Sequence, residues 1–289
     1  RASSGDDVVS EWYTEKLYPD WQTRYRITKE LARKKTAFQR MRVLESPVCG
    51  RMLVLDDITQ TTEFDEFVYH EMMTHVAMVG HGRCRNALII GGGDGGILRE
   101  VLAHPVERAV QVEIDSEVVA FSKKHLPGIS RGAYDDPRTE LLIGDGADYV
   151  KHCEDRFDVV IVDSPDPVGP AKVLFETPFY RDVVRVLRRG GLMVRQAGVP
   201  HLQPDELQYT MKRMRKVFPA TALAVAPVPT YVGGFFTFAF GATASTPLRR
   251  SRRFAAERIH ALGLKTRYYN EEIHTACFAL PNHIKELLK

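Results

Sequence analysis

The chain has 289 residues, and its 40 Lys and Arg against 37 Asp and Glu leave a net charge of only +3. That balance excludes a protein that coats nucleic acid or an anionic membrane, so neither partner is expected. The length predicts one or two domains, and a 44% apolar fraction without any run near the ~18 residues of a membrane span predicts a globular protein.

Residues 1–62 have the pattern of a small antiparallel β domain. Short stretches in this part mix aromatic or β-branched residues with polar ones and are separated by Pro and Gly turn signals. The stretches are Trp21–Ile27, Ala37–Glu45 and Arg51–Leu55. The remainder, residues 63–289, is expected to form a second domain that opens with a helix over Glu66–Gly80, where apolar residues recur near a helical period.

Apolar, strand-like runs alternate with helix-like stretches from Asn86 onward. The expected strands of this part are Ala87–Ile90, Ala109–Val112, Glu140–Ile143, Val159–Val162 and Leu192–Val194. The alternation predicts βαβ units and a mostly parallel sheet with helices on both faces. Two later runs, Ala222–Val228 and Gly234–Phe240, are expected to pair antiparallel at the sheet edge. A helix over Leu248–Leu262, entered through residues 245–247, is expected to follow them.

The four cysteines, at positions 49, 84, 153 and 277, are too far apart in the sequence for a Cys-x-x-Cys motif. Neither a zinc site nor a redox motif is therefore expected. Free thiols in a chain without a recognisable signal peptide favour a reducing cytoplasm as its location.

Ligand-binding residues are expected where the parallel strands end, because open α/β sheets bind ligands at that edge. A glycine-rich loop that includes Gly91, Gly93 and Gly95 follows the first of these strands and opens a helix, so its backbone N–H groups can approach a ligand. Glu113 ends the next strand, 17 residues beyond Gly96 (113 − 96), near the ~20 expected for a carboxylate that binds ribose hydroxyls. The combination predicts an adenosine-containing ligand.

Carboxylates dominate the same edge of the predicted sheet. Asp94, Asp145, Asp163 and Asp166 follow four different strands, with no Lys or Arg in those loops. Such carboxylates are costly to hold together unless a cation neutralises them. Asp94 also stands inside the glycine loop, where it would repel the pyrophosphate of a dinucleotide.

Two kinds of cation could neutralise these carboxylates. A divalent metal at Asp163 and Asp166 is one alternative, although the sequence offers no His or further carboxylate at ligand spacing beside them. Organic polycations fit better, because Tyr69, Tyr231 and Trp12 are aromatic residues that could lie against them.

Nine segments, in order and over nearly the whole chain, match the motifs of one family. The segments are Leu53–Asp56, Gln60–Glu63, Asp65–Met72, Leu88–Gly96, Val112–Asp115, Tyr134–Arg138, Asp163–Pro170, Pro229–Tyr231 and Arg267–Asn270. With them the chain resembles the spermidine synthases, the aminopropyltransferases of polyamine biosynthesis, and the bacterial branch most of all.

The resemblance implies an α/β fold of the methyltransferase-like, Rossmann type, preceded by the small antiparallel β domain. It also implies transfer of an aminopropyl group from decarboxylated S-adenosylmethionine to putrescine, which yields spermidine and methylthioadenosine. The donor is a co-substrate, so no cofactor and no metal are implied. Members of the family form homodimers or homotetramers, and here the β domain is the expected contact. The segment Gly169–Glu176 is expected to act as a lid.

The resemblance also implies roles for individual residues. Asp163 matches the catalytic acid, which takes a proton from the attacking amine with the help of Tyr69. Asp94 would pair with the ammonium of the donor and repel the carboxylate of ordinary S-adenosylmethionine, and Asp166 would bind the far ammonium of the diamine. The resemblance further implies contacts of Gln39, Glu113 and Asp145 with the nucleoside and of Tyr231 with the amine. Position or aromatic character adds Gly146 to the nucleoside contacts and His70, Gln196 and Trp12 to the amine contacts.

Three departures from the family pattern concern the amine acceptor. Pro165 replaces a small hydroxyl residue, Phe64 replaces Arg, and Asp57 stands where Gly is common. Putrescine, cadaverine, agmatine and spermidine therefore stay open as acceptors. A methyltransferase that uses intact S-adenosylmethionine is a rival, which Asp94 and the lack of an acidic residue at Ile89 disfavour. A non-catalytic binding protein is a second rival, which the presence of the catalytic-type residues disfavours.

Overall fold

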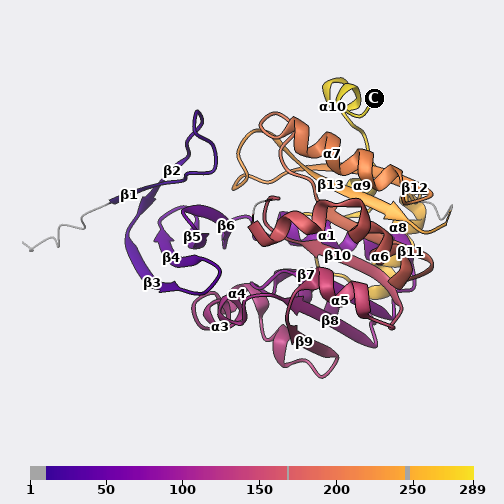
Figure 1. Ribbon diagram of the computed structural model, residues 1–289, viewed down its shortest axis with the longest axis horizontal. Helices are drawn as coiled ribbons and strands as arrows, with labels where there is room; N and C mark the ends of the chain where they lie inside the picture. Colours follow the sequence, from indigo (N-terminus) through magenta and orange to yellow (C-terminus); the bar gives the residue numbers. More distant parts are fainter. Residues whose placement is uncertain (1–10, 168, 245–247) are drawn as a thin grey trace, which may run out of the picture.

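A computed structural model describes residues 11–167, 169–244 and 248–289. In these residues a small antiparallel β unit precedes a larger α/β domain, and Figure 1 shows the two side by side. The first ten residues of the expected β domain and the expected helix entry at 245–247 lie outside the described residues. No helix in the described part of the chain is long and apolar enough to cross a membrane.

The N-terminal unit is antiparallel throughout, as predicted. Its strands are β1 (Glu11–Thr14) and β2 (Arg24–Ile27), which pair with each other, and β3 (Lys29–Lys35), β4 (Arg40–Ser46), β5 (Gly50–Leu55) and β6 (Ile58–Thr62), which pair in that order. The sequence patterns missed β1, β3 and β6. In β3 the reason is plain, because five of its seven side chains are charged and several are exposed, so no apolar alternation marks the strand.

The α/β domain is built on a seven-stranded sheet with the order β12-β13-β11-β10-β7-β8-β9. Its strands are β7 (Asn86–Gly91), β8 (Arg108–Glu113), β9 (Thr139–Ile143), β10 (Phe157–Asp163), β11 (Leu187–Gln196), β12 (Ala220–Pro227) and β13 (Phe235–Ala242). The strands from β11 to β9 are parallel, whereas β13 pairs antiparallel with β11 and β12 antiparallel with β13. The mostly parallel sheet and its antiparallel edge pair are both confirmed.

Helices cover both faces of this sheet (Figure 1). One face carries α1 (Glu66–His81), α2 (Gly96–Leu102), α8 (Arg252–Leu262) and α9 (Glu271–Ala276). The other carries α5 (Gly146–His152), α6 (Thr177–Val186), α7 (Pro204–Arg215) and α10 (Asn282–Leu287). The central strand β10 is apolar along its length because Val159 and Ile161 pack into the first layer and Val160 and Val162 into the second.

The N-terminal sheet packs on α3 (Ser116–His125) and α4 (Pro127–Ser130) through a separate apolar cluster. In it Met41 and Val43 from β4 lie with Phe121 and Leu126. Two short 3₁₀ segments, η1 (Ala133–Asp135) and η2 (Gly169–Phe175), complete the chain order. This packing brings the loop between β3 and β4 beside the edge of the large sheet where its parallel strands end.

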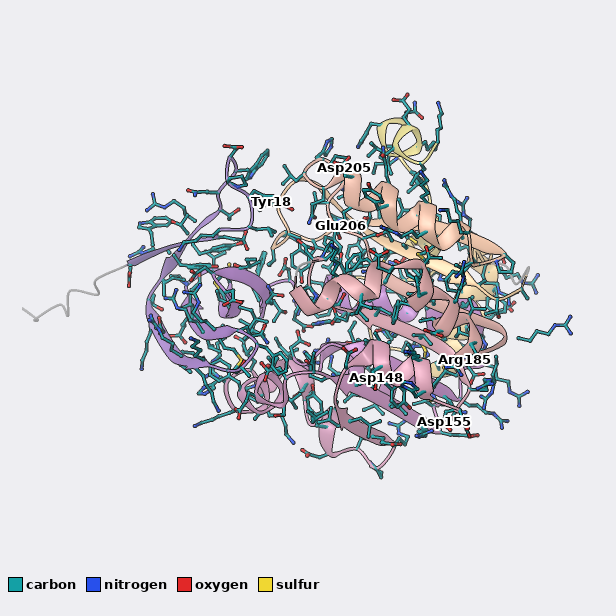
Figure 2. All side chains as sticks on the ribbon, in the orientation of Figure 1. Tyr18, Asp148, Asp155, Arg185, Asp205 and Glu206 are labelled. Atoms are coloured by element: carbon teal, nitrogen blue, oxygen red, sulfur yellow. The ribbon has the colours of Figure 1, made fainter. Side chains whose placement is uncertain are left out.

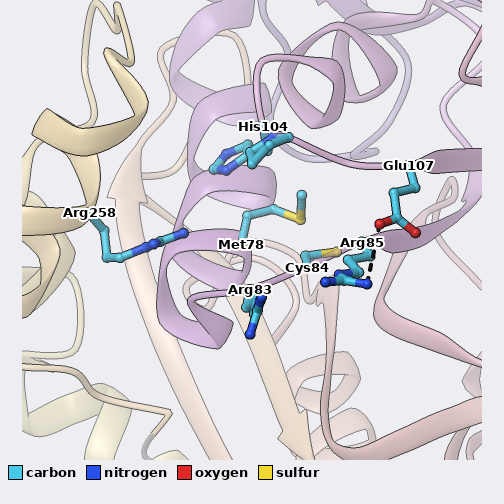
Figure 3. A pocket seen from close by; sticks show the side chains of 8 residues that line it. Met78, Arg83, Cys84, Arg85, His104, Glu107 and Arg258 are labelled. Atoms are coloured by element: carbon cyan, nitrogen blue, oxygen red, sulfur yellow. Dashed lines mark ion pairs between the residues drawn. The ribbon is translucent and has the colours of Figure 1, made fainter.

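A hollow lies at the C-terminal end of α1, between the start of β7 and α8. Figure 3 shows its lining, which combines basic side chains with Met78 and Cys84, and an ion pair of 3.4 Å between Arg85 and Glu107. None of the residues that the sequence predicts for the functional site lines this hollow.

Candidate active site

The glycine loop and the end of β10 meet in a backbone contact. Gly91 has a φ of +84°, and the N–H of Gly92 donates to the carbonyl of Asp163 at 3.1 Å. A Cβ atom at Gly91 would overlap that carbonyl, so a residue with a side chain cannot take this position. Asp94 lies three residues after Gly91. The contact therefore brings Asp94 to the same edge of the sheet as Asp163.

Asp163 is the centre of the predicted site. The Tyr69 hydroxyl, from α1, donates to Asp163 Oδ1 at 2.6 Å. Burial and the nearby Asp94 charge raise the pKa of Asp163 to about 6, although the Tyr69 hydrogen bond and the charge of His70 lower it. Burial also raises the pKa of Tyr69 well above its usual value, so Tyr69 stays a neutral donor. Near neutral pH, Asp163 is therefore a carboxylate able to take up a proton.

Asp94 is held by two neighbours. Its Oδ1 accepts the N–H of Gly96 at 2.8 Å, and its Oδ2 lies 3.4 Å from Nε2 of His70. The His70 side chain is only 2% exposed, and its Nδ1 lies 2.6 Å from Glu66. The carboxylates of this edge are thus not without a basic partner, which the loop sequences alone did not reveal because His70 comes from α1.

Tyr69 and Tyr231 form an aromatic wall beside the two carboxylates. Their ring centroids are 5.5 Å apart with the planes at 79°, and Phe236 from β13 packs edge-on against Tyr69. The Tyr231 hydroxyl donates to the carbonyl of Gln60 at 2.6 Å. Thr230, which precedes Tyr231, donates its N–H and its hydroxyl to the buried Asp65 carboxylate, both at 2.6 Å. These two hydrogen bonds hold the Tyr231 loop against the start of α1.

The expected nucleoside residues lie on the β8 side of the same edge. Glu113 is 7% exposed, and burial raises its pKa to about 7. A Cβ atom at Gly93 would come within 3.0 Å of the Glu113 carboxylate. Gln39, from the N-terminal unit, donates to Asp115 at 3.0 Å, so the two parts of the chain meet here.

Asp145 and Gly146 stand at the end of β9, at the margin of this group. Asp145 is exposed and caps α5, and its carboxylate accepts the N–H groups of Ala147 at 2.7 Å and Asp148 at 3.2 Å. Gly95 lies in the glycine loop with a φ of +81° and caps the start of α2.

Asp166 and Gln196 lie at the other side of Asp163. Asp166 accepts a hydrogen bond from Gln203 at 2.7 Å, and burial raises the pKa of Asp166. Gln196 is 4% exposed and donates to the carbonyl of Ser164 at 3.2 Å.

Two further residues join Asp166 that the sequence patterns did not identify. Burial and the Asp166 charge raise the pKa of Glu206, on α7, to about 7. Tyr18, from the loop between β1 and β2, lies near both carboxylates, as Figure 2 shows with Tyr18 and Glu206 on facing segments. Tyr18 had only a turn signal around it, and α7 was not expected, so no pattern pointed to either residue.

Arg195 is a third residue that the sequence patterns missed. It is fully buried in β11, with its guanidinium 3.5 Å from the ring centroid of Phe175 and donating to the carbonyl of Leu174 at 2.6 Å. It therefore ties η2, the expected lid, to the sheet. The available signal was a charged residue directly after the apolar run Leu192–Val194 of β11.

Trp12 is the expected amine contact that the structure does not bring to the site. It lies on β1, its side chain is 53% exposed, and the guanidinium of Arg24 on the paired strand lies 5.5 Å from its ring. It lines a groove of the N-terminal unit together with Lys29 and Asp57. The turn after β1 carries Tyr18, rather than Trp12, toward Asp166.

In the described ranges, no three His, Cys, Asp or Glu side chains are grouped so as to hold a metal ion. The carboxylates of the site are instead spread along a row from Glu113 past Asp94 and Asp163 to Asp166, with aromatic rings on one side. Such a row can hold an elongated ligand with more than one positive charge.

Two family models match the chain. Residues 66–250 match the spermine/spermidine synthase domain, and residues 11–63 match the spermidine synthase tetramerisation domain. The first match covers the α/β domain from the start of α1 to just before α8, and the second covers the strands of the N-terminal unit.

Similar proteins agree with these matches over nearly their whole length. The polyamine aminopropyltransferase of Ruegeria sp. (strain TM1040) is 46% identical over 96% of this chain and 98% of its own, and polyamine aminopropyltransferase 1 of Pseudomonas aeruginosa is 45% identical over 96% and 97%. Among solved structures, a spermidine synthase in complex with the transition-state analogue AdoDATO superposes with a TM-score of 0.92 at 36% identity, covering 98% of this chain and 97% of that one.

The spermidine synthase of Thermotoga maritima is also similar, with a TM-score of 0.89 at 34% identity over 98% of this chain and 96% of that one. Fold, sequence and motif order thus point the same way. The chain belongs to the spermine/spermidine synthase family and is an aminopropyltransferase.

Proposed function

We propose that the protein transfers the aminopropyl group of decarboxylated S-adenosylmethionine to putrescine, which yields spermidine and methylthioadenosine. The observation that carries this proposal is a pair of carboxylates beside Tyr69, namely Asp94 in the glycine loop and Asp163 at the end of β10. One carboxylate suits the ammonium of a cationic donor, and the other suits an amine that must lose a proton.

The proposed chemistry is a single displacement. The sulfonium of the donor makes the adjacent aminopropyl carbon electrophilic, and the attacking amine forms the new C–N bond as the C–S bond breaks. A primary amine has a pKa of about 10, so it is protonated at neutral pH and must first be deprotonated. Asp163, with its pKa near 6, takes up that proton, and Tyr69 holds the carboxylate in place.

Binding residues for the two substrates follow from the row of carboxylates. Gln39, Glu113 and Asp145 would bind the nucleoside, and the glycine loop would lie against it. On the amine side, Asp166 and Gln196 would hold the far ammonium of the diamine, with Tyr231 along its chain. The donor is consumed in the reaction, so the proposal includes no resident cofactor or metal.

Cadaverine, agmatine and spermidine are alternative acceptors. Glu206 and Tyr18 extend the polar lining beyond Asp166, which supports an acceptor with a cationic group at its far end. Pro165 lies exposed in the loop between the two aspartates and lacks an N–H. The identity of the amine acceptor is therefore to be determined by experiment.

We further propose that the chain assembles as a homodimer or homotetramer through its N-terminal unit, the part that matches the tetramerisation model. A cytoplasmic location also stays a prediction, which the four free cysteines support.

Donor selectivity tests the proposed function. The wild-type protein should form methylthioadenosine from the decarboxylated donor and none from intact S-adenosylmethionine. Asp94→Asn should reduce kcat/KM for the decarboxylated donor roughly a hundredfold, because loss of one partner of a buried charge pair costs about 3 kcal/mol. Asp148→Asn is the matched control, since that side chain is 71% exposed on α5. Methyl transfer from intact S-adenosylmethionine would contradict the proposal.

A further inference from the structure

His70 lies between two carboxylates inside the site. Its Nδ1 is 2.6 Å from Oε2 of Glu66, and its Nε2 is 3.4 Å from Oδ2 of Asp94. The ring packs so closely on the first turn of α2 that a Cβ atom at Gly96 would overlap it. Burial lowers the pKa of His70, but Asp94 and Glu66 outweigh burial and the pKa is raised. The free protein therefore holds His70 as an imidazolium.

Glu66 is itself held by a second cation, Arg99, besides His70. The guanidinium of Arg99 donates to both of its oxygens, at 3.1 and 2.9 Å, and also donates to the carbonyl of Ile129 at 2.6 Å. The Glu66 side chain is 4% exposed; burial raises its pKa, but His70 and Arg99 outweigh burial and lower it. Glu66 is thus a carboxylate whose position does not depend on a bound ligand.

Four charged side chains act on His70 from the elements packed around it. They are Glu66 from its own helix, Asp94 from the glycine loop, Asp163 from the end of β10 and, through Glu66, Arg99 from α2. His70 makes a hydrogen bond with Glu66 through Nδ1, at 2.6 Å, whereas Nε2 and Asp94 form a longer ion pair of 3.4 Å. When the ring loses a proton, the proton on Nδ1 is therefore the one retained.

We propose that binding of an ammonium group at Asp94 expels the proton from Nε2 of His70, and that Glu66 is the positioning residue that keeps the other proton on Nδ1. The inference rests on the proposed function, in which the ammonium of the donor pairs with Asp94. An ammonium and an imidazolium on one buried carboxylate repel each other, so one cation replaces the other.

The exchange balances in atoms and charge. One proton leaves Nε2 for the solvent as one ammonium enters, so the charge beside Asp94 stays the same. The sulfonium of the donor adds one further positive charge to the pocket. The lone pair that Nε2 regains can then accept an N–H of the ammonium. His70 thereby changes from a counter-ion of Asp94 in the free protein to a second ligand of the donor.

The exchange makes donor binding depend on pH with a defined sign. While the free protein holds the proton and the complex does not, the Kd for the donor falls about tenfold for each unit of rising pH. The dependence ends where the free protein itself loses the proton. Methylthioadenosine shares the nucleoside but has neither the ammonium nor the sulfonium, so its Kd should not change with pH through the His70 proton.

Calorimetry counts the proton directly. Titrations of the wild-type protein at about pH 8, in two buffers of different ionisation enthalpy, give the number of protons released by each ligand. The decarboxylated donor should release about one proton more than methylthioadenosine. Glu113 also faces the nucleoside and has a raised pKa, so it could release a proton with either ligand. Subtracting the proton count of methylthioadenosine from that of the donor removes this contribution.

Two variants separate the roles of the residues. His70→Gln should bind the donor with no more proton release than methylthioadenosine causes. Glu66→Gln should reduce the proton count for the donor and leave the Kd of methylthioadenosine unchanged. Glu257→Gln, on the exposed face of α8, is the matched control and should behave as wild type. If a variant fails to fold, the two-ligand comparison on the wild-type protein still decides the matter.

The outcomes distinguish this inference from the proposed function. Equal proton release by donor and methylthioadenosine, with the donor bound and turned over, would overturn the inference and leave the function intact. Full proton release in Glu66→Gln would overturn the positioning role. A donor that neither binds nor reacts would overturn the proposed function, and the inference with it.

Discussion

Asp163 must be basic enough to take a proton from an amine and still be a carboxylate at neutral pH. Two opposing influences set this balance. Burial and the Asp94 charge raise the pKa of Asp163, and the 2.6 Å hydrogen bond from Tyr69 lowers it. Tyr69 can act only as a donor here, because burial keeps its own pKa well above the usual value. Tyr69 thus controls the pH at which the base becomes active.

Removal of that hydrogen bond should shift the pH dependence. The base works only when unprotonated, so kcat/KM should fall as the pH drops through about 6 in the wild-type protein. In Tyr69→Phe, the acid limb should move up by about one unit, since a hydrogen bond to a charged group contributes about 1.5 kcal/mol. This shift should lower kcat/KM about twofold at pH 7 and about tenfold at pH 5.

The measurement is kcat/KM against pH for both proteins, with Tyr209→Phe as control. Tyr209 is an exposed tyrosine on α7, 58% accessible, so its loss should leave the profile unchanged. An acid limb that stays in place in Tyr69→Phe, or moves to lower pH, would show that Tyr69 does not act on the base.

At the scale of elements, α1 organises the site. One turn of this helix supplies Tyr69 to Asp163 and His70 to Asp94, while the next residue, Glu71, faces away. Its carboxylate accepts three consecutive N–H groups from Arg267 to Tyr269, at 2.8 to 2.9 Å, and so anchors the segment between α8 and α9. The helix is therefore fixed from its outer side, which keeps its inner side in register with the strand ends.

The elements that could be predicted are those whose burial leaves a periodic pattern. The helix over Glu66–Gly80 and strands such as Val159–Val162 are apolar because the sheet is covered on both faces, and both were expected within a few residues. The highly charged β3 and the helix α7 were not expected. In both elements the apolar residues are few and separated by charged or polar ones, because one side of the strand and of the helix faces solvent.

The site divides in the same way. Glu113, Asp94 and Asp163 could be placed together from the sequence because the carboxyl ends of parallel strands meet at one edge. Arg195 and Glu206 could not, since their approach depends on how η2 and α7 pack on the sheet. Trp12 was expected at the site because it is aromatic, and that property does not tell which way the turn after β1 runs.

At the scale of the whole molecule, the N-terminal unit presents aromatic side chains to solvent. Trp12 and Trp21 are 53% and 52% exposed, and tryptophan is enriched at protein–protein contact surfaces. The unit also supplies Gln39 to the large domain, so assembly through it would hold that residue in place.

Light scattering coupled to gel filtration should give a mass of at least twice the 32.7 kDa of one chain. Trp12→Glu should reduce that mass by placing a charge in the contact, whereas Tyr209→Glu, at another exposed aromatic residue, should not. A wild-type mass equal to one chain would contradict assembly.

The most direct test of the account is a product assay of the complete enzyme. Wild-type protein and Asp163→Asn would each receive decarboxylated S-adenosylmethionine with putrescine, cadaverine, agmatine and spermidine together, and mass spectrometry would identify the products. Wild type should yield methylthioadenosine and one aminopropylated amine, which names the acceptor. Asp163→Asn should lose this turnover, by about a hundredfold or more, and still bind methylthioadenosine. Full turnover by Asp163→Asn, or no aminopropylated amine from wild type, would contradict the account.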